Sequence, residues 1–209
     1  MTDMMKFRTL FYMAGVDGKL VDNGIAAWTQ LIHSWRLLNK EQRAIILKGF
    51  SHEEIWLPDE RGSFEFGYFR IYHDRHYYNG TCYTSTMGQL RDKNAPASNG
   101  TVKRPASEVL KHPGRWCFAE FEIRASSYTL LEAYLKREVA NNRGYGKKDI
   151  GKFFGLGFMS DPNRNICSEL GNNAMITADI LEGLFRVVSP LMSALLVVKA
   201  GYKIQELKA

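Results

Sequence analysis

The chain has 209 residues, of which 45% are hydrophobic, 12% aromatic and 24% charged. This composition excludes a disordered chain and predicts a single compact domain over residues 1–209 with a sizeable core. The formal net charge is +6, and its densest part lies between residues 136 and 152. A basic surface of this kind could attract an anionic partner, but no motif of an RNA- or DNA-binding module accompanies it, and a solvated basic face is the alternative interpretation.

Three cysteines, Cys82, Cys117 and Cys167, show neither a CxxC pair nor the spacing of a metal site. This odd, sparse set predicts free thiols in a reducing compartment, so we expect a cytoplasmic protein with no metal and no cofactor. The opening residues lack the apolar core of a signal peptide, and the apolar run over 187–198 is shorter than the ~20 residues that span a bilayer. We therefore expect neither a signal peptide nor stable insertion into a membrane.

In chain order, the first predicted element is a strand over residues 7–13, which ends at a glycine-containing turn. Apolar residues three and four positions apart then predict a helix over 23–38. A second short helix is predicted over 39–50, with Asn39 as its N-cap and Gly49 at its end. The strands that follow are predicted over 52–57, 63–72 and 79–87, the last of them starting at an Asn-Gly turn.

The second half of the chain opens with a polar stretch rich in turn-forming residues, so residues 91–115 are predicted to be an exposed loop. Residues 115–123 alternate as a strand that places Cys117 on the more apolar face, which favours an inert core thiol. The later predicted elements are helices over 126–142 and 167–185 and a final helix or strand over 190–207. Strands in the middle of the chain with helices on both sides indicate an α+β fold.

Cys167 begins the helix predicted over 167–185, and a thiol at this position has two interpretations. It is either a buried small hydrophobe or a nucleophile whose pKa is lowered by the N–H groups and the dipole of the helix start. A thiol nucleophile needs a base, and the base needs a polar orienter. His52 begins a strand and Glu54 follows on the same face, so the two have the residue types of a base and its orienter. A strand-end histidine without a catalytic role is the alternative.

Several stretches of the chain, read in order, carry a likeness to a known family: LFYMAGVDGKLVDNGIAAWTQ, FSHEEIWL, CYTSTMGQLR, NGTVKR, the W-x-F of the strand over 115–123, and NICSEL. Together they resemble the circularly permuted NlpC/P60 superfamily of papain-like thiol hydrolases, particularly its YiiX-like and virus-encoded branches. There, a Ser-His pair with a glutamate two residues later starts the first core strand, and a Cys-Ser-Glu triplet opens the nucleophile helix. The matching residues are Ser51, His52 and Glu54, and the triplet that starts at Cys167.

This resemblance implies an antiparallel sheet packed against helices, with the nucleophile at a helix N-terminus. It also implies one domain with a helical insertion at about 31–50 and a hairpin or loop insertion at about 66–80. Carried onto this chain, it makes Cys167 the nucleophile, His52 the base and Glu54 the orienter, with the Cys167 backbone N–H in the oxyanion hole. The other candidates for the third polar residue are Glu65, Ser85 and Thr84, and the implied substrate-binding residues are Tyr145 and Ser51.

The activity that the resemblance implies is that of a cysteine hydrolase or acyltransferase acting on an amide or ester bond, without a cofactor. The substrates it suggests are a peptidoglycan peptide or an acyl or lipid group. For a virus-encoded chain, such as a phage protein, the location would be the cytoplasm of the host cell. Two alternatives stay open: a catalytically degenerate binding module, and a structural protein of a virion that binds polyanions through the net positive charge.

Overall fold

The computed structural model describes residues 3–13, 39–40, 43, 48–66, 77–87, 99–141, 144–145, 164–182 and 189–207. The predicted helix over 23–38 lies outside these residues, as do most of the helix predicted over 39–50 and most of the insertion expected at about 66–80. The greater part of the basic stretch between residues 143 and 152 also lies outside them.

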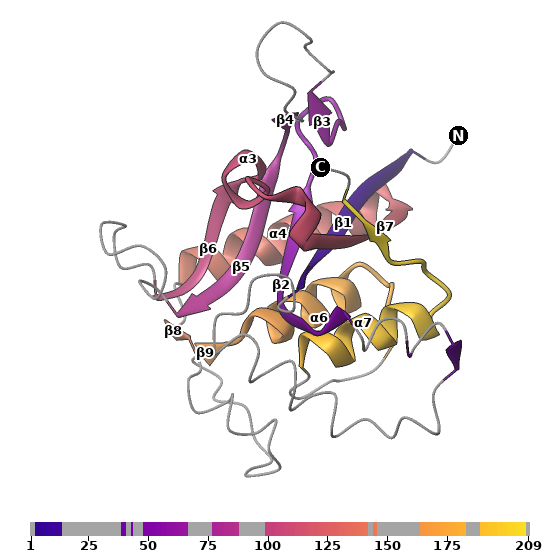
Figure 1. Cartoon of the computed structure of the whole chain (residues 1–209). Helices are drawn as coiled ribbons and strands as arrows, with labels where there is room; N and C mark the ends of the chain where they lie inside the picture. Colours follow the sequence, from indigo (N-terminus) through magenta and orange to yellow (C-terminus); the bar gives the residue numbers. More distant parts are fainter. Residues whose placement is uncertain are drawn as a thin grey trace, which may run out of the picture.

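An antiparallel sheet of six strands forms the centre of the described part of the chain (Figure 1). Its strand order is β10-β7-β1-β2-β5-β6. The strand bounds are β1 (Met4–Met13), β2 (Phe50–Leu57), β5 (Thr81–Met87), β6 (Asn99–Pro105), β7 (Trp116–Arg124) and β10 (Gln205–Glu206). Because β1 and β2 are the central strands, nearly every residue of β2 is buried.

Two short pairs of strands accompany this sheet. One is the antiparallel pair β3 (Glu65–Phe66) and β4 (Tyr77–Tyr78), which follows β2 in the chain. The other is the parallel pair β8 (Gly144–Tyr145) and β9 (Arg164–Asn165), which directly precedes the helix that begins at Cys167.

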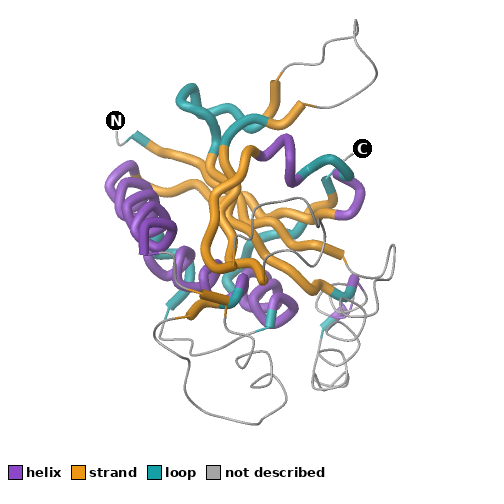
Figure 2. The backbone as a smooth tube through the Cα atoms, turned by 90° about the vertical axis from the view of Figure 1, so that its left-hand side faces the viewer, coloured by secondary structure: helices purple, strands orange, loops and turns teal. Residues whose placement is uncertain are grey.

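Three helices cover one face of the six-stranded sheet (Figures 1 and 2). They are α4 (Ala125–Asn141), α6 (Cys167–Thr177) and α7 (Pro190–Lys199). The start of α7 is fixed locally, since the Ser189 hydroxyl accepts a hydrogen bond from the Met192 N–H at 3.1 Å and Pro190 occupies the first turn.

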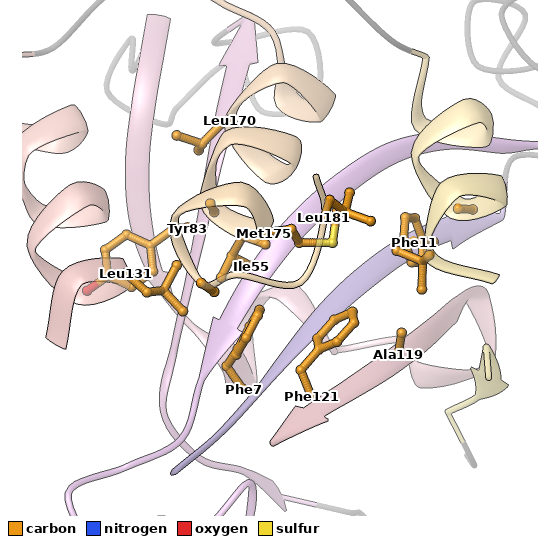
Figure 3. Packing of buried hydrophobic residues seen from close by; sticks show 14 of the residues in the cluster. Phe7, Phe11, Ile55, Tyr83, Ala119, Phe121, Leu131, Leu170, Met175 and Leu181 are labelled. Atoms are coloured by element: carbon orange, nitrogen blue, oxygen red, sulfur yellow. The ribbon is translucent and has the colours of Figure 1, made fainter. Parts of the chain in front are cut away.

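The main hydrophobic core lies between the sheet and these helices (Figure 3). Phe7 and Phe11 of β1 and Ile55 of β2 pack with Leu131 of α4 and Leu170 of α6, and all five side chains are fully buried. Burial of one such side chain contributes about 1.5–3 kcal/mol, so this core holds the helices on the sheet.

The opposite face of the sheet carries a smaller cluster around Trp56. The indole meets the rings of Phe64 and Tyr78 edge to face, with centroids 4.9 and 5.7 Å away. The short helix α3 (Ala106–Val109) covers part of this cluster. Side chains alternate along a strand, so Ile55 faces the helices while Trp56, and with it His52 and Glu54, belongs to the opposite face.

The predicted exposed loop over 91–115 is wrong where the structure describes it, because residues 99–115 form β6, α3 and the 3-10 turn η3 (Pro113–Arg115). Among the described strands, β6 lies at the edge of the sheet and pairs with β5 alone. Such a strand accommodates polar and charged side chains, here exposed Lys103 beside buried Thr101, so its sequence resembles a loop.

The helix predicted over 167–185 also ends too late, since α6 stops at Thr177. Asp179 has φ of 59°, in the left-handed region, which reverses the chain after the helix. By contrast, the strand over 115–123 is confirmed as β7, with Cys117 on the core face, and the helix over 126–142 is confirmed as α4.

The described fold is therefore α+β, an open antiparallel sheet with helices, as the sequence predicted at this level. Within the described ranges, no helix has the length and apolar character needed to cross a membrane.

Candidate active site

A local divergence of two neighbouring strands creates the candidate site. The last residues of β2 pair with the first residues of β5, and the rest of the two strands is not paired. The register pairs are Ile55 with Tyr83, Trp56 with Cys82 and Leu57 with Thr81. The first residues of β2 keep their partners on β1 but have none on β5. Here the Thr84 hydroxyl donates to the Glu53 carbonyl at 2.9 Å, and α6 begins beside the start of β2 (Figure 1). Cys167 thereby reaches His52, although α6 packs on the opposite face of the sheet.

The thiol of Cys167 is buried, and its pKa is lowered. Its side chain stands at the first position of α6, after Ile166 in extended conformation, and the residue is 5% exposed. Burial by itself raises the pKa of this thiol, but the His52 charge, a hydrogen bond with His52 and backbone hydrogen bonds from Glu53 and Ser168 lower it further than burial raises it. The net direction is downward, which favours the thiolate.

His52 shows the matching shift in the opposite direction. Burial lowers the pKa of the imidazole, while the charge and hydrogen bond of Cys167 and the hydrogen bond and charge of Glu54 raise it, to about 9. The side chain keeps 20% of its surface exposed. A lowered thiol pKa beside a raised imidazole pKa favours the thiolate–imidazolium form of this pair.

The contacts of the ring fix which nitrogen faces the sulfur. His52 Nε2 lies 3.2 Å from Glu54 Oε1 and 3.2 Å from Thr84 Oγ1. Since the Thr84 hydroxyl gives its proton to the Glu53 carbonyl, it accepts from His52, as does the carboxylate. Nε2 is therefore the donor toward these two oxygens, and Nδ1 is the nitrogen left for Cys167.

Glu54 is held from a third strand. Its side chain has no exposed surface, and Oε1 contacts both His52 Nε2 and the Arg104 guanidinium. Arg104 belongs to β6, where it pairs in register with Cys82 of β5. Arg104 was not among the predicted site residues, because the polar sequence of this edge strand has no clear strand pattern and was predicted to be a loop.

Aromatic rings flank the other side of His52. Trp116 of β7 meets the imidazole edge to face with centroids 6.2 Å apart, and it meets Tyr12 of β1 at 5.2 Å. Tyr12 is the register partner of both His52 and Trp116, so the three rings form a row across β7, β1 and β2. This row limits the rotation of the imidazole.

The remaining predicted residues lie in different places. Thr84 contacts His52. Ser85 is buried on the opposite face of β5, the face that Tyr83, two residues earlier, also occupies. Ser51 is buried next to His52, and its hydroxyl has no hydrogen-bond partner among the described residues. Tyr145 lies in β8, and its side chain is outside the described part of the structure.

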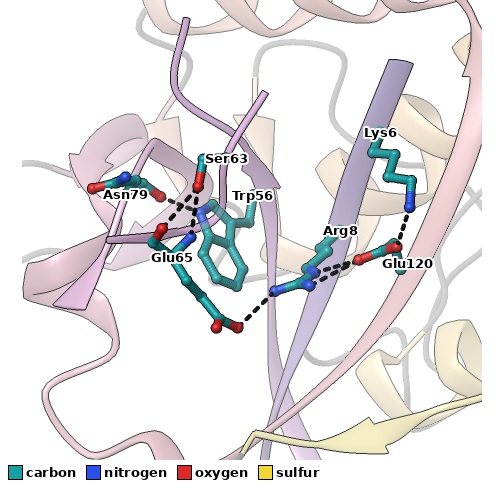
Figure 4. A network of polar contacts seen from close by, with 7 residues as sticks. All are labelled: Lys6, Arg8, Trp56, Ser63, Glu65, Asn79 and Glu120. Carbon is teal, nitrogen blue, oxygen red and sulfur yellow. Dashed lines mark hydrogen bonds and ion pairs between the residues drawn. The ribbon is translucent and has the colours of Figure 1, made fainter. Parts of the chain in front are cut away.

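Glu65 lies in a separate polar network (Figure 4). Its carboxylate is 3.8 Å from Arg8 Nη1, and Arg8 also pairs with Glu120 at 2.8 Å. The guanidinium sits over the ring of Phe64 at 4.2 Å. His52, Glu54 and Cys167 take no part in the network drawn there, so the structure does not bring Glu65 to the candidate site.

One further carboxyl group lies under the nucleophile and was not foreseen. Glu53 is fully buried on the helix side of β2, and its carboxyl fills the space that a side chain at Gly171 of α6 would occupy. Burial raises the pKa of Glu53 well above its usual range, and the nearby Ser193 hydroxyl and His52 offset this only in part. The raised pKa favours the neutral carboxyl, which rests against the helix backbone at Gly171, one turn after Cys167.

Within the described residues, no group of three or more His, Cys, Asp and Glu side chains could hold a metal ion. Comparisons of the chain with models of protein families, with curated proteins and with solved structures find no match.

Proposed function

We propose that the chain is a papain-like thiol hydrolase or acyltransferase that cleaves an amide or ester bond through Cys167. The observation that carries the proposal is the direct pairing of Cys167 with His52, in which the pKa of the thiol is lowered and that of the imidazole raised. A buried structural cysteine has the opposite property, as Cys82 and Cys117 show, since burial raises the pKa of both thiols.

The chemistry follows from these positions. The Cys167 thiolate attacks the carbonyl carbon of the substrate, and the developing oxyanion accepts a hydrogen bond from the Cys167 backbone N–H at the start of α6. As the tetrahedral intermediate collapses, the imidazolium of His52 gives its Nδ1 proton to the departing amine or alcohol, which leaves a thioester. Neutral His52 then takes a proton from water or another acceptor, and attack of that acceptor on the thioester releases Cys167.

The order of the site along the chain supports the finer proposal of a permuted NlpC/P60 fold. The base lies on a central strand, and the nucleophile follows much later at the start of a helix, which is the order of the permuted superfamily. A peptidoglycan peptide or an acyl or lipid group is the substrate class that this proposal suggests.

The proposal is tested by alkylation with iodoacetamide at neutral pH, with each cysteine quantified by mass spectrometry after digestion. Cys167 should react at least about tenfold faster than Cys82 and Cys117, because thiolate fraction governs the rate. His52→Ala should remove this advantage. Equal reactivity of the three cysteines would refute the enzyme proposal and favour a binding module that kept only the fold.

Activity is then sought with two panels of chromogenic substrates, acyl esters of increasing chain length and short peptide amides. Cleavage should disappear in Cys167→Ala and in His52→Ala. Cys117→Ala is the matched control, because Cys117 is a buried core thiol on β7 with a pKa raised to about 11. Turnover that survives in Cys167→Ala would exclude Cys167 as the nucleophile.

A further inference from the structure

We propose that Arg104 is a positioning residue of the site, which balances the charge of Glu54 and thereby keeps His52 aligned with Cys167; this inference rests on the proposed function. The contacts run through two strands and a helix. Arg104 on β6 contacts Glu54 on β2, Glu54 contacts His52, and His52 contacts Cys167 at the start of α6.

The burial of Glu54 makes a permanent cation necessary. Its carboxylate has no exposed surface, and its second oxygen, Oε2, has no hydrogen-bond partner among the described residues. A buried carboxylate without a counter-charge is strongly unfavourable. His52 is a cation only while it holds both protons, and it loses one in the reaction proposed above. The Arg104 guanidinium stays charged throughout, so Glu54 keeps a counter-charge in both states of His52.

A second observation places the two charges together. Cys82 of β5 lies between β2 and β6, as the register partner of Trp56 on one side and of Arg104 on the other. Burial raises the pKa of Cys82 and the Glu54 charge raises it further, whereas Arg104 lowers it. Both charged groups therefore act on the same buried thiol, and the Arg104 side chain, 40% exposed, reaches Glu54 across β5.

The charges along this path alternate and sum to zero: guanidinium, carboxylate, imidazolium and thiolate. Burial raises the pKa of Glu53, the other carboxyl near Cys167, which favours its neutral form, so Glu53 is left out of this sum. Removing the guanidinium leaves a net negative charge in a buried site, so formation of the thiolate requires a higher pH. Removing the carboxylate alone has the reverse effect, because the site is then left with a net positive charge.

The test is the pH dependence of iodoacetamide alkylation at Cys167. Arg104→Gln should move the acid limb of the profile upward by about one pH unit, a tenfold loss of rate on that limb, and leave the alkaline plateau unchanged. Arg104→Lys should restore most of the wild-type limb, because it restores the charge. Lys103→Gln is the matched control: it removes the same charge from an exposed neighbour on β6 and should leave the profile unchanged.

A purely structural role would alter stability without moving the limb. An Arg104→Gln profile identical to the wild type overturns the inference, as does an equal shift in Lys103→Gln. If Arg104→Gln does not fold, Glu54→Gln is compared with Glu54→Gln/Arg104→Gln, which removes both partners. The acid limb of the alkylation profile should lie at lower pH in Glu54→Gln than in the double variant. Acid limbs at the same pH overturn the inference. A wild-type Cys167 that titrates like an ordinary thiol refutes the proposed function itself, so the two failures are distinguishable.

Discussion

Replacing Gly171 by alanine tests the contact between α6 and β2 that sets how far Cys167, at the start of α6, lies from β2. A methyl group at this position would lie well inside contact distance of Glu53 Oε1 and 3.0 Å from Glu53 Cγ, where carbon atoms normally approach to about 3.5–4.0 Å. Glu53 is fully buried and cannot turn aside into solvent. Helix α6 must therefore shift away from β2 to accept the new side chain.

Two opposing effects decide the size of the change. Alanine in place of a helical glycine ordinarily stabilises by about 1 kcal/mol, because it restricts the unfolded chain. Overpacking of a close-packed interior costs about 1–3 kcal/mol. Since the clash falls on a buried carboxyl group with no free space, we expect the overpacking to exceed the stabilisation by alanine. The free energy of unfolding should therefore fall by about 1–2 kcal/mol.

Urea unfolding measures the stability, and iodoacetamide alkylation of Cys167 measures the position of the thiol. The alkylation rate at neutral pH should fall by about tenfold in Gly171→Ala, because a displacement of the helix start separates the sulfur from His52. Gly114→Ala is the control, because a methyl group there meets nothing within 4 Å.

A double-mutant cycle with Glu53→Ala identifies the cause. Removal of the carboxyl opens the space that the alanine methyl needs, so Glu53→Ala/Gly171→Ala should be less destabilised than the sum of the single variants by about 1–3 kcal/mol. Additive effects, or a Gly171→Ala protein with wild-type stability and wild-type alkylation, would refute the view that Glu53 and Gly171 set this contact.

The remaining predictions concern the pH dependence and the two faces of the sheet. Because the pKa of His52 is raised to about 9 in the folded state, the stability it contributes is complete below its unfolded value of 6.5 and is lost as pH rises through about 9; urea midpoints measured across this window should fall in the wild type and stay flatter in His52→Ala. In Cys167→Ala the pKa of His52 should fall, since burial remains while the attraction of the thiolate is gone, and ring-proton NMR titration would show it; an unchanged pKa would contradict the pairing. Thr84→Val should cost about 1 kcal/mol and lower Cys167 alkylation, with Thr84→Ser close to wild type, because the hydroxyl joins His52 Nε2 to the Glu53 carbonyl. Arg8→Gln should lower the urea midpoint yet leave Cys167 alkylation unchanged, since its partners Glu120, Trp56 and Phe64 lie in the separate network; a loss of alkylation would mean that the two regions are coupled.

The strands and helices with strong periodicity were predictable from the sequence. The positions of β1, β2, β7 and α4 follow from their sequences, and the alternation of β7 also gives its buried face, whereas β1 and β2 are central strands that are buried on both faces. The start of α6 at Cys167 was also predicted, and the structure brings Cys167, His52 and Glu54 together, while their catalytic roles stay a prediction.

The parts that escaped prediction depend on contacts between distant segments. β6 is polar because it is an edge strand, so its sequence has no clear strand pattern, and Arg104 was lost with it. Glu53 and Glu54 are adjacent in the chain and point to opposite faces; only the packing of α6 shows that Glu53 contacts Gly171 while Glu54 contacts His52. The end of α6 was missed because an apolar run continues past Thr177.

The divergence of β2 from β5 also affects how the chain behaves while it is being made. The site joins residues that are far apart in sequence: His52 and Thr84 are 32 positions apart, Glu54 and Arg104 are 50 positions apart, and α6 follows later still. Contacts of such separation form late in folding, because long loops must close first. Until α6 docks beside β2, Cys167 lacks the partners that lower its pKa and is no more reactive than Cys82 or Cys117. A nascent chain therefore carries three ordinary thiols, and the nucleophile comes into existence only with the finished fold.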